Sequence, residues 1–315
     1  MIKPINSTNV SSRADNHTID QKTGEYKDPL MNWPLRGAAF TNEVGEALRP
    51  IIGNAANMTW VPALMYIGAD VYDKYKNDQT EYSPDSKRCL KQAIFQGLAS
   101  VFLPVVAVKL GQNAFSQFGK FTEDKISLNA KEHVSKVAEQ FIANGKMRAY
   151  DGRDEECIKE FLDHVSDSMD FSNKKKSLKN TFKIFSLDKK ENVEKYSIKT
   201  IKNLIQMRKD LLNPTTEVKA GGWYSKYIKA LKSGQTESVA VKSVLTNFQK
   251  GQLMKGNFIK TIGGFCALGL AIKPIDHFVE NVLIGKYVGP QIDNFKINNP
   301  NGLLLKKIKK FFTKC

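Results

Sequence analysis

The chain has 315 residues, of which 48 are Lys or Arg and 32 are Asp or Glu, so its net charge is +16. This length suffices for one large domain or two ordinary ones, and the mean hydropathy of −0.38 limits any membrane part to a minority of the chain. The charge indicates an anionic partner, while four scattered cysteines exclude a disulfide framework or a Cys-based metal site.

Residues 1–31 are rich in Asn, Ser, Thr and Asp and contain no apolar core of a signal peptide. They also carry several acidic residues, which mitochondrial transit peptides avoid. We therefore expect a disordered N-terminal segment without a cleavable signal.

Residues 32–119 contain two uncharged runs, Pro50–Ala69 and Gln92–Val108. A hydrocarbon layer of about 30 Å needs roughly 17–25 apolar helical residues, so these runs predict a hairpin of two membrane-spanning helices. The first run contains three polar residues and each run contains a proline, so burial in a large soluble core remains an alternative.

Residues 120–255 are polar and rich in lysine, with apolar residues at helical spacing. One such set is Val134, Val137, Ala138 and Phe141. Alternating β-branched runs are absent, so we expect an all-α chain in which this region is an inserted, soluble, basic helical module.

Residues 256–290 form a third apolar region whose uncharged part, Thr261–Ile272, is too short to cross a bilayer alone. Lys273 and Pro274 interrupt it, and an amphipathic pattern follows. A re-entrant turn or an interfacial helix would keep the basic segments on one membrane face, as the positive-inside tendency favours. A row of small residues also indicates close helix packing, in a bilayer or in a soluble core. Its members are Gly263, Ala267 and Ala271.

Residues 291–315 form a basic C-terminal tail that alternates apolar residues with lysines. This pattern is typical of an interfacial helix whose lysines meet lipid headgroups. The expected headgroup contacts are Lys306, Lys307, Lys309 and Lys310. Nucleic acid is the disfavoured partner, because no aromatic and basic residues interleave as they do on a nucleic-acid-binding platform.

Catalysis has no candidate residues in this sequence. The four histidines share no metal-ligand spacing, and neither a phosphate-binding glycine loop nor a dinucleotide-binding glycine pattern occurs. We therefore predict no catalytic, cofactor or metal site, and a protein that is not an enzyme.

Four blocks in the apolar regions are similar to a known family. They are N-E-V-G-E-A-L-R at Asn42–Arg49, the pairs Ala69-Asp70 and Asp73-Lys74, Q-G-L-A-S-V at Gln96–Val101 with Pro104, and P-I-D at Pro274–Asp276 with Val279-Glu280. In this order they resemble the mitochondrial fission process protein family, also called the mitochondrial 18 kDa protein family. The resemblance covers about residues 33–115 and 256–290, and it departs at Lys273, where the family has histidine, and at Phe95, where it has tryptophan.

The residues that carry this resemblance are referred to below as the motif residues. They are Asn42, Gly45, Glu46, Arg49, Asp70, Asp73, Gln96, Ser100, Pro104, Pro274 and Asp276. From their place in the pattern we expect Asp70 and Asp73 to mark the water boundary of the first run. Asp276 would be the N-cap or first-turn acid of the amphipathic helix.

The resemblance implies a non-enzymatic, mostly helical integral membrane protein with a role in membrane organisation or division. Its location would be the mitochondrial inner membrane in a eukaryote or the plasma membrane in a bacterium. Partners would be the bilayer and other membrane proteins, or a second copy of the chain. Two alternatives stay open: a soluble or peripheral helical protein that binds anionic membrane or nucleic acid through its lysines, and a small transporter or channel subunit that uses Asp276 and Lys273.

Overall fold

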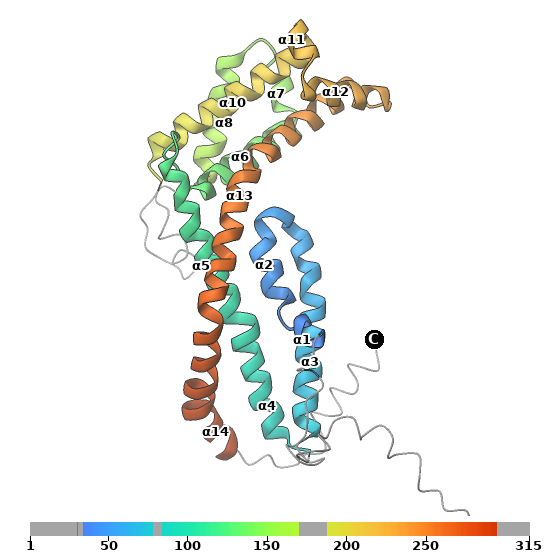
Figure 1. The fold of residues 1–315 in the computed structure, drawn as a ribbon. Helices are drawn as coiled ribbons and strands as arrows, with labels where there is room; N and C mark the ends of the chain where they lie inside the picture. The colour runs from blue at the N-terminus through green and yellow to red at the C-terminus, as the bar shows by residue number, and fades with distance from the viewer. Residues whose placement is uncertain (1–29, 31–33, 78–83, 170–187, 295–315) are drawn as a thin grey trace, which may run out of the picture. The chain divides into compact units, whose positions relative to one another are not determined.

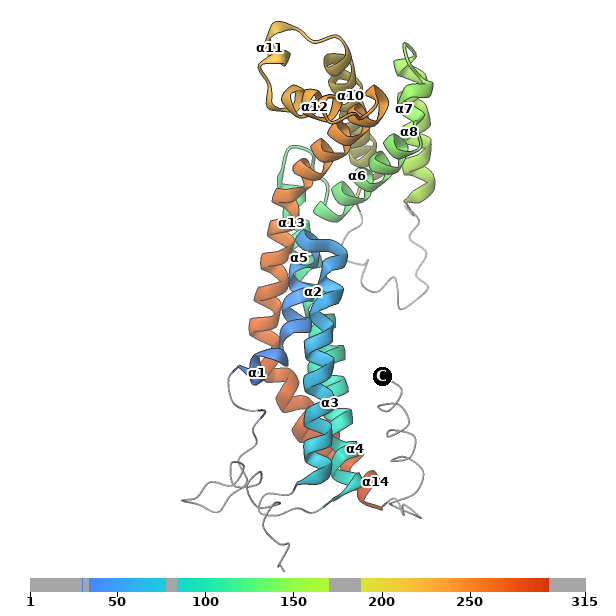
Figure 2. The same cartoon turned by 90° about the vertical axis from the view of Figure 1, so that its right-hand side faces the viewer.

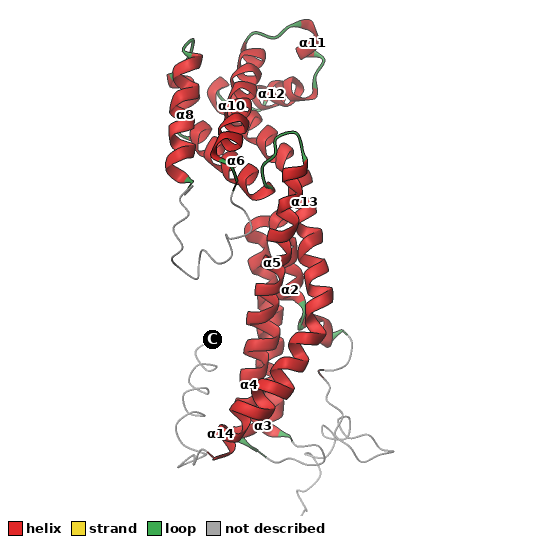
Figure 3. Ribbon diagram, turned by 90° about the vertical axis from the view of Figure 1, so that its left-hand side faces the viewer, coloured by secondary structure: helices red, strands yellow, loops and turns green. Residues whose placement is uncertain are grey.

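The computed structural model describes residues 30, 34–77, 84–169 and 188–294. The described residues form helices joined by loops, with no β-strand element (Figure 3), so the prediction of an all-α chain is confirmed for them. The predicted N-terminal segment, apart from Leu30, and the tail with Lys306, Lys307, Lys309 and Lys310 lie outside the described residues.

The chain divides into two compact units, and each is described separately. The first unit comprises residues 1–46, 54–107 and 268–315, and the second comprises residues 47–53 and 108–267. The second unit includes the whole of the predicted inserted module, residues 120–255.

Residues 35–76 form a helical hairpin. Helices α1 (Leu35–Ala38) and α2 (Thr41–Ile52) lead into the 3-10 segment η2 (Gly53–Thr59), and α3 (Trp60–Lys76) follows. Gly53, at the turn, has a φ of +58°, a left-handed conformation that glycine adopts at little cost.

Helix α4 (Ser86–Phe95) begins at the N-cap Asp85, whose carboxylate accepts a hydrogen bond from the Lys87 backbone N–H at 2.8 Å. It continues as the π-helical segment η3 (Gln96–Phe102) and then as α5 (Leu103–Ser116). Within the first unit, α4 packs against α3 and also against η5 (Phe278–Val288) and α14 (Gly289–Asn294), as Figures 1 and 2 show.

The second unit has its own hydrophobic core. After η4 (Gln117–Phe121) come α6 (Leu128–Ala143), α7 (Lys146–Ala149), α8 (Asp154–Ser168), α10 (Lys190–Leu212), α11 (Thr216–Lys219), α12 (Gly222–Lys232) and α13 (Glu237–His277). Side chains of α6, α8, α10 and the start of α13 fill this core, and Phe141 and Phe161 meet edge to face with ring centroids 5.5 Å apart. The apolar set Val134, Val137, Ala138 and Phe141 is buried there, as its spacing predicted.

Two helices among the described residues are long and apolar enough to cross a membrane. They are Ser86–Phe121, which contains the predicted run Gln92–Val108, and Glu237–Asn294. The structure therefore has as many candidate spanning helices as the sequence predicted, and one of the two predicted positions coincides with a candidate. The other predicted helix, Pro50–Ala69, is not continuous, because η2 separates α2 from the 17 residues of α3.

The third apolar region contains no re-entrant turn. Helix α13 runs through Pro274 and continues without a break into η5 and α14. A proline removes one backbone hydrogen bond of its helix, and a long helix can accommodate this loss as a local distortion. The short apolar stretch Thr261–Ile272 is therefore part of a much longer helix.

Candidate functional site

Among the described residues of the first unit, five polar side chains are buried: Asn42, Glu43, Glu46, Asp70 and Gln96. Four of them are motif residues, and three of the five are acids. Ionisable groups within an apolar helical unit are costly and are often functional, so this cluster is the candidate site.

Asp70 is the acceptor on which the cluster converges. Its Oδ2 accepts hydrogen bonds from Gln92 Nε2 and from Gln96 Nε2, each at 2.5 Å. Asp70 lies on α3, whereas the two glutamines lie on α4 and η3. Asp70 is only 5 % exposed, so the expectation that it marks the water boundary is wrong; neutral amides solvate its carboxylate instead.

Hydrogen bonds extend this arrangement to α2. Ser100 Oγ donates to Gln96 Oε1 at 2.6 Å, and Asn42 Nδ2 donates to the backbone carbonyl of Ser100 at 2.8 Å. We call Asn42, Ser100, Gln96, Asp70 and Gln92 the polar chain. It joins three helical segments that lie far apart in the sequence, and Oδ1 of the fully buried Asn42 has no hydrogen-bond partner.

A second group of contacts holds the two arms of the hairpin together. Glu46 Oε1 accepts a hydrogen bond from Trp60 Nε1 at 3.0 Å. Gly45 faces Thr59 so closely that a Cβ atom added to it would lie 1.8 Å from Thr59 Oγ1. The motif glycine is therefore required by packing between α2 and the end of η2.

The remaining motif residues lie around this cluster or apart from it. Arg49 is half-buried in the last turn of α2, and Pro104 is fully buried near the start of α5. Asp73 accepts a hydrogen bond from Asn77 Nδ2 at 2.9 Å and is half-buried.

Pro274 and Asp276 are exposed residues of α13. Since that helix does not begin there, the expectation that Asp276 caps a helix is wrong. The Asp276 carboxyl instead interacts electrostatically with the buried Glu43 of α2.

Three residues in or next to this cluster, Gln92, Trp60 and Glu43, were not among the site residues predicted from the sequence. Gln92 lies four positions before Gln96, so helical spacing places both on one face and could have revealed it. Trp60 and Glu43 carry no comparable signal, because their partners are fixed only by the way in which the segments pack.

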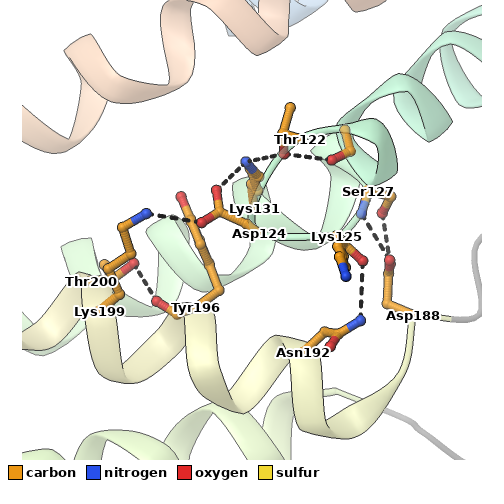
Figure 4. A network of polar contacts seen from close by, with 11 residues as sticks. Thr122, Asp124, Lys125, Ser127, Lys131, Asp188, Asn192, Tyr196, Lys199 and Thr200 are labelled. Atoms are coloured by element: carbon orange, nitrogen blue, oxygen red, sulfur yellow. Dashed lines mark hydrogen bonds and ion pairs between the residues drawn. The ribbon is translucent and has the colours of Figure 1, made fainter.

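A separate polar network fastens α6 to α10 in the second unit (Figure 4). Asp124 accepts hydrogen bonds from Lys131 Nζ at 2.5 Å and from Lys199 Nζ at 3.0 Å. Burial of the Asp124 carboxyl favours its protonated form, but the hydrogen bonds and charges of both lysines outweigh this and hold the pKa of Asp124 below its ordinary value. This ion cluster holds the segment that leads into the N-terminus of α6 in place.

Asp188, which precedes α10, also contacts the N-terminus of α6. Its carboxylate accepts hydrogen bonds from the Ser127 backbone N–H at 2.8 Å and from Ser127 Oγ at 2.7 Å (Figure 4). Ser127 is itself the N-cap of α6 and accepts from the Ala130 N–H at 3.1 Å. These contacts are structural, because each of them joins two groups of the chain.

The chemistry available to the polar chain is hydrogen bonding between helices. Interhelical amide and hydroxyl contacts of this kind hold helices together where water is absent. Within the ranges that the structure describes, no group of three or more His, Cys, Asp and Glu residues could hold a metal ion. Gln96 and Ser100 both lie on the π-helical segment η3, a distortion that is frequent at functional sites.

Comparisons with family models, with curated proteins and with solved structures found no match for this chain.

Proposed function

We propose that the chain is a non-enzymatic integral membrane protein of the mitochondrial fission process type, with a role in membrane organisation or division. The observation that carries the membrane assignment is the exposure of its two long apolar helices. Only 22 % of the most apolar window of Ser86–Phe121 and 28 % of that of Glu237–Asn294 is buried. The core helix of a soluble protein would be mostly covered by other parts of the chain.

The exposed side chains are large and apolar. Phe121 is 86 % exposed and Leu270 is 80 % exposed. Further members on the same two helices are Phe102, Leu110, Phe118, Met254, Phe258, Ile262, Phe265 and Phe278. Such side chains are costly in water and neutral or favourable in acyl chains, so a bilayer is the environment that satisfies them.

The four sequence blocks support the assignment to the fission process type. Residues of three of the four blocks are joined by hydrogen bonds. They are Asn42 of the first block, Asp70 of the second, and Gln96 and Ser100 of the third, and all four belong to the polar chain. By this proposal the membrane is the mitochondrial inner membrane in a eukaryote and the plasma membrane in a bacterium.

Two continuous helices also imply a topology. If each crosses the bilayer once, the connection from residue 122 to residue 236 lies on one face, and Ser86 and Asn294 lie at the other. This arrangement differs from the expected one, in which the basic module and the basic tail share a face. Long connections are exempt from the positive-inside tendency, so charge does not oppose it.

Carbonate extraction of membranes tests the anchoring, and release of the chain into the soluble fraction would contradict it. Topology is tested in a background with all four native cysteines replaced by alanine, to which Gln235→Cys or Asn294→Cys is added; both positions are exposed. An impermeant maleimide should label one of the two in intact vesicles and the other only after the vesicles are opened. Equal labelling of both in intact vesicles would refute two single crossings.

The division role is tested by depleting the protein in its cell of origin. Mitochondria, or bacterial cells, should become longer because fewer divisions are completed. Wild-type morphology after complete depletion would contradict the division role, but it would not contradict the membrane anchoring.

A further inference from the structure

The second unit carries a run of lysines with no acidic residue among them. Residues 218–236 contain Lys219, Lys226, Lys229 and Lys232 and neither Asp nor Glu. All four lysines are exposed, three of them on α12 and one on the neighbouring α11. We call these four residues the lysine face.

Other lysines of the same unit are paired with carboxylates. Lys131 and Lys199 share Asp124, and Lys146 Nζ lies 2.6 Å from Glu160 Oε1. In contrast, no residue of the lysine face forms an ion pair within the part of the chain that the structure describes. The first acid after α12, Glu237, interacts electrostatically with Tyr227 and with Arg208.

Packing fixes which side of α12 faces outward. Tyr227 is buried, and the Trp223 ring meets the Phe248 ring edge to face with centroids 5.6 Å apart. Lys226 Nζ lies 4.0 Å from the centre of the Trp223 ring, which is half-buried between these contacts. The aromatic side chains of α12 therefore pack toward the core, whereas its lysine side chains are exposed to solvent.

Lysines three positions apart on a helix repel one another, and without acids this repulsion lowers the stability of α12. An external anion that contacts several ammonium groups at once would offset the repulsion. We propose that the lysine face docks on the anionic phospholipid surface of a bilayer. This inference rests on the proposed function, because it adds a headgroup contact of the second unit to the anchoring helices.

The chemistry favours phospholipid over nucleic acid. A lysine ammonium group acts on phosphate as a point charge. It lacks the planar pair of N–H donors with which arginine recognises the edges of bases. Single-stranded nucleic acid also requires aromatic rings free to stack on bases, whereas the Trp223 ring already contacts Phe248 and Lys226. A row of exposed lysines suits headgroups, because anionic lipid attracts each lysine near the surface.

The test uses the full chain in nanodiscs of neutral phosphatidylcholine, mixed with vesicles that contain about one third phosphatidylserine. Every variant carries glutamine at all six tail lysines, 296, 306, 307, 309, 310 and 314, so that tail lysines do not contribute to binding. Nanodiscs should float with the anionic vesicles at low salt, and neither with neutral vesicles nor at 0.5 M salt. The triple variant Lys226→Gln/Lys229→Gln/Lys232→Gln should bind on the order of a hundredfold more weakly.

The matched control removes the same charge from three exposed lysines elsewhere in the unit, through Lys159→Gln/Lys189→Gln/Lys202→Gln. Its binding should change by less than about threefold, because scattered charges are screened. Equal losses in both triple variants, or unchanged binding in the α12 variant, would overturn the proposal. So would preference for a DNA or RNA oligonucleotide over the anionic vesicles.

Failure of the membrane anchor remains distinguishable from failure of this docking. A chain that does not stay with nanodisc lipid contradicts the proposed function, and its free form can then be floated with the same vesicles. Loss of that flotation in the α12 variant, but not in the control, would still support the lysine face.

Discussion

A Cβ atom on Gly111 would lie 2.2 Å from the carbonyl oxygen of Gly263, and one on Gly263 would lie 2.6 Å from the carbonyl oxygen of Gly111. The two glycines let the backbones of α5 and α13 approach each other without side chains between them. Ala267 packs at the same place, since its Cβ would lie 2.5 Å from a Cβ added to Gly111, so Gly263 and Ala267 of the predicted small-residue row lie at a helix contact.

Replacing Gly263 by alanine should destabilise the protein by about 1–3 kcal/mol, because the added methyl group forces α5 and α13 apart. The control is Gly269→Ala on the same helix, where an added Cβ meets nothing within 4 Å. That change should be neutral or stabilising by up to about 1 kcal/mol, since alanine is the better helix former. Detergent-solubilised chains unfolded by heat would show the difference, and equal melting temperatures for both variants would contradict the packing.

Gly45→Ala should also be destabilising, by about 1–3 kcal/mol, since Thr59 cannot move away easily. Its hydroxyl donates to the Ala56 carbonyl at 2.7 Å and is thereby held against Gly45. Gly68→Ala in α3 is the matched control, because its Cβ would lie in open space. Thermal unfolding of both variants in detergent provides the measurement; a harmless Gly45→Ala would show that the hairpin arms are not in contact as described.

Asp70 and Gln96 should be energetically coupled. Gln96→Ala removes one donor from the Asp70 carboxylate and the acceptor of Ser100 Oγ, so we expect a loss of about 1 kcal/mol, in line with interhelical hydrogen bonds in membranes. A double-mutant cycle with Asp70→Ala should give a positive coupling energy of roughly 0.5–1.5 kcal/mol. Additive losses would indicate that the two side chains do not interact.

Acid should weaken the junction between α6 and α10. Because the pKa of Asp124 is below its ordinary value in the folded chain, the stability it contributes is fully present above about pH 4 and is lost as the pH falls through the folded pKa. Asp124→Asn should cost about 1 kcal/mol at pH 7 and should show a flatter decline toward acid.

The pH dependence is best followed by hydrogen exchange of peptides from α6 and α10 in the full chain. Wild-type protection of these peptides should decrease below about pH 4, after correction for the intrinsic exchange rate. Glu191→Gln is a suitable control, because its partner Lys195 lies four residues along the same exposed helix face and the pair bridges no two helices. Identical profiles for wild type and Asp124→Asn would exclude the ion cluster as the cause.

Periodicity and charge in the sequence alone determined that the described part of the chain is helical and that Gln92–Val108 belongs to an apolar helix. They also determined that Val134, Val137, Ala138 and Phe141 face a core. These features are local, because each depends on the spacing of side chains along one helix. The sequence could not show that Pro50–Ala69 is divided at Gly53–Thr59, or that α13 continues through Pro274. Turn and proline effects are decided by what packs around them, which no local pattern contains.

The candidate site shows the same division. Its motif residues could be named from the sequence, but their chemistry could not. From the sequence, Asp70 is expected to lie at the water boundary. In the fold α4 lies beside α3, and Gln92 and Gln96 donate hydrogen bonds to the Asp70 carboxylate. Asn42 reaches Ser100 across 58 positions of sequence. Only the tertiary structure decides such pairings, because burial of polar groups is tolerated solely where distant segments supply the hydrogen bonds.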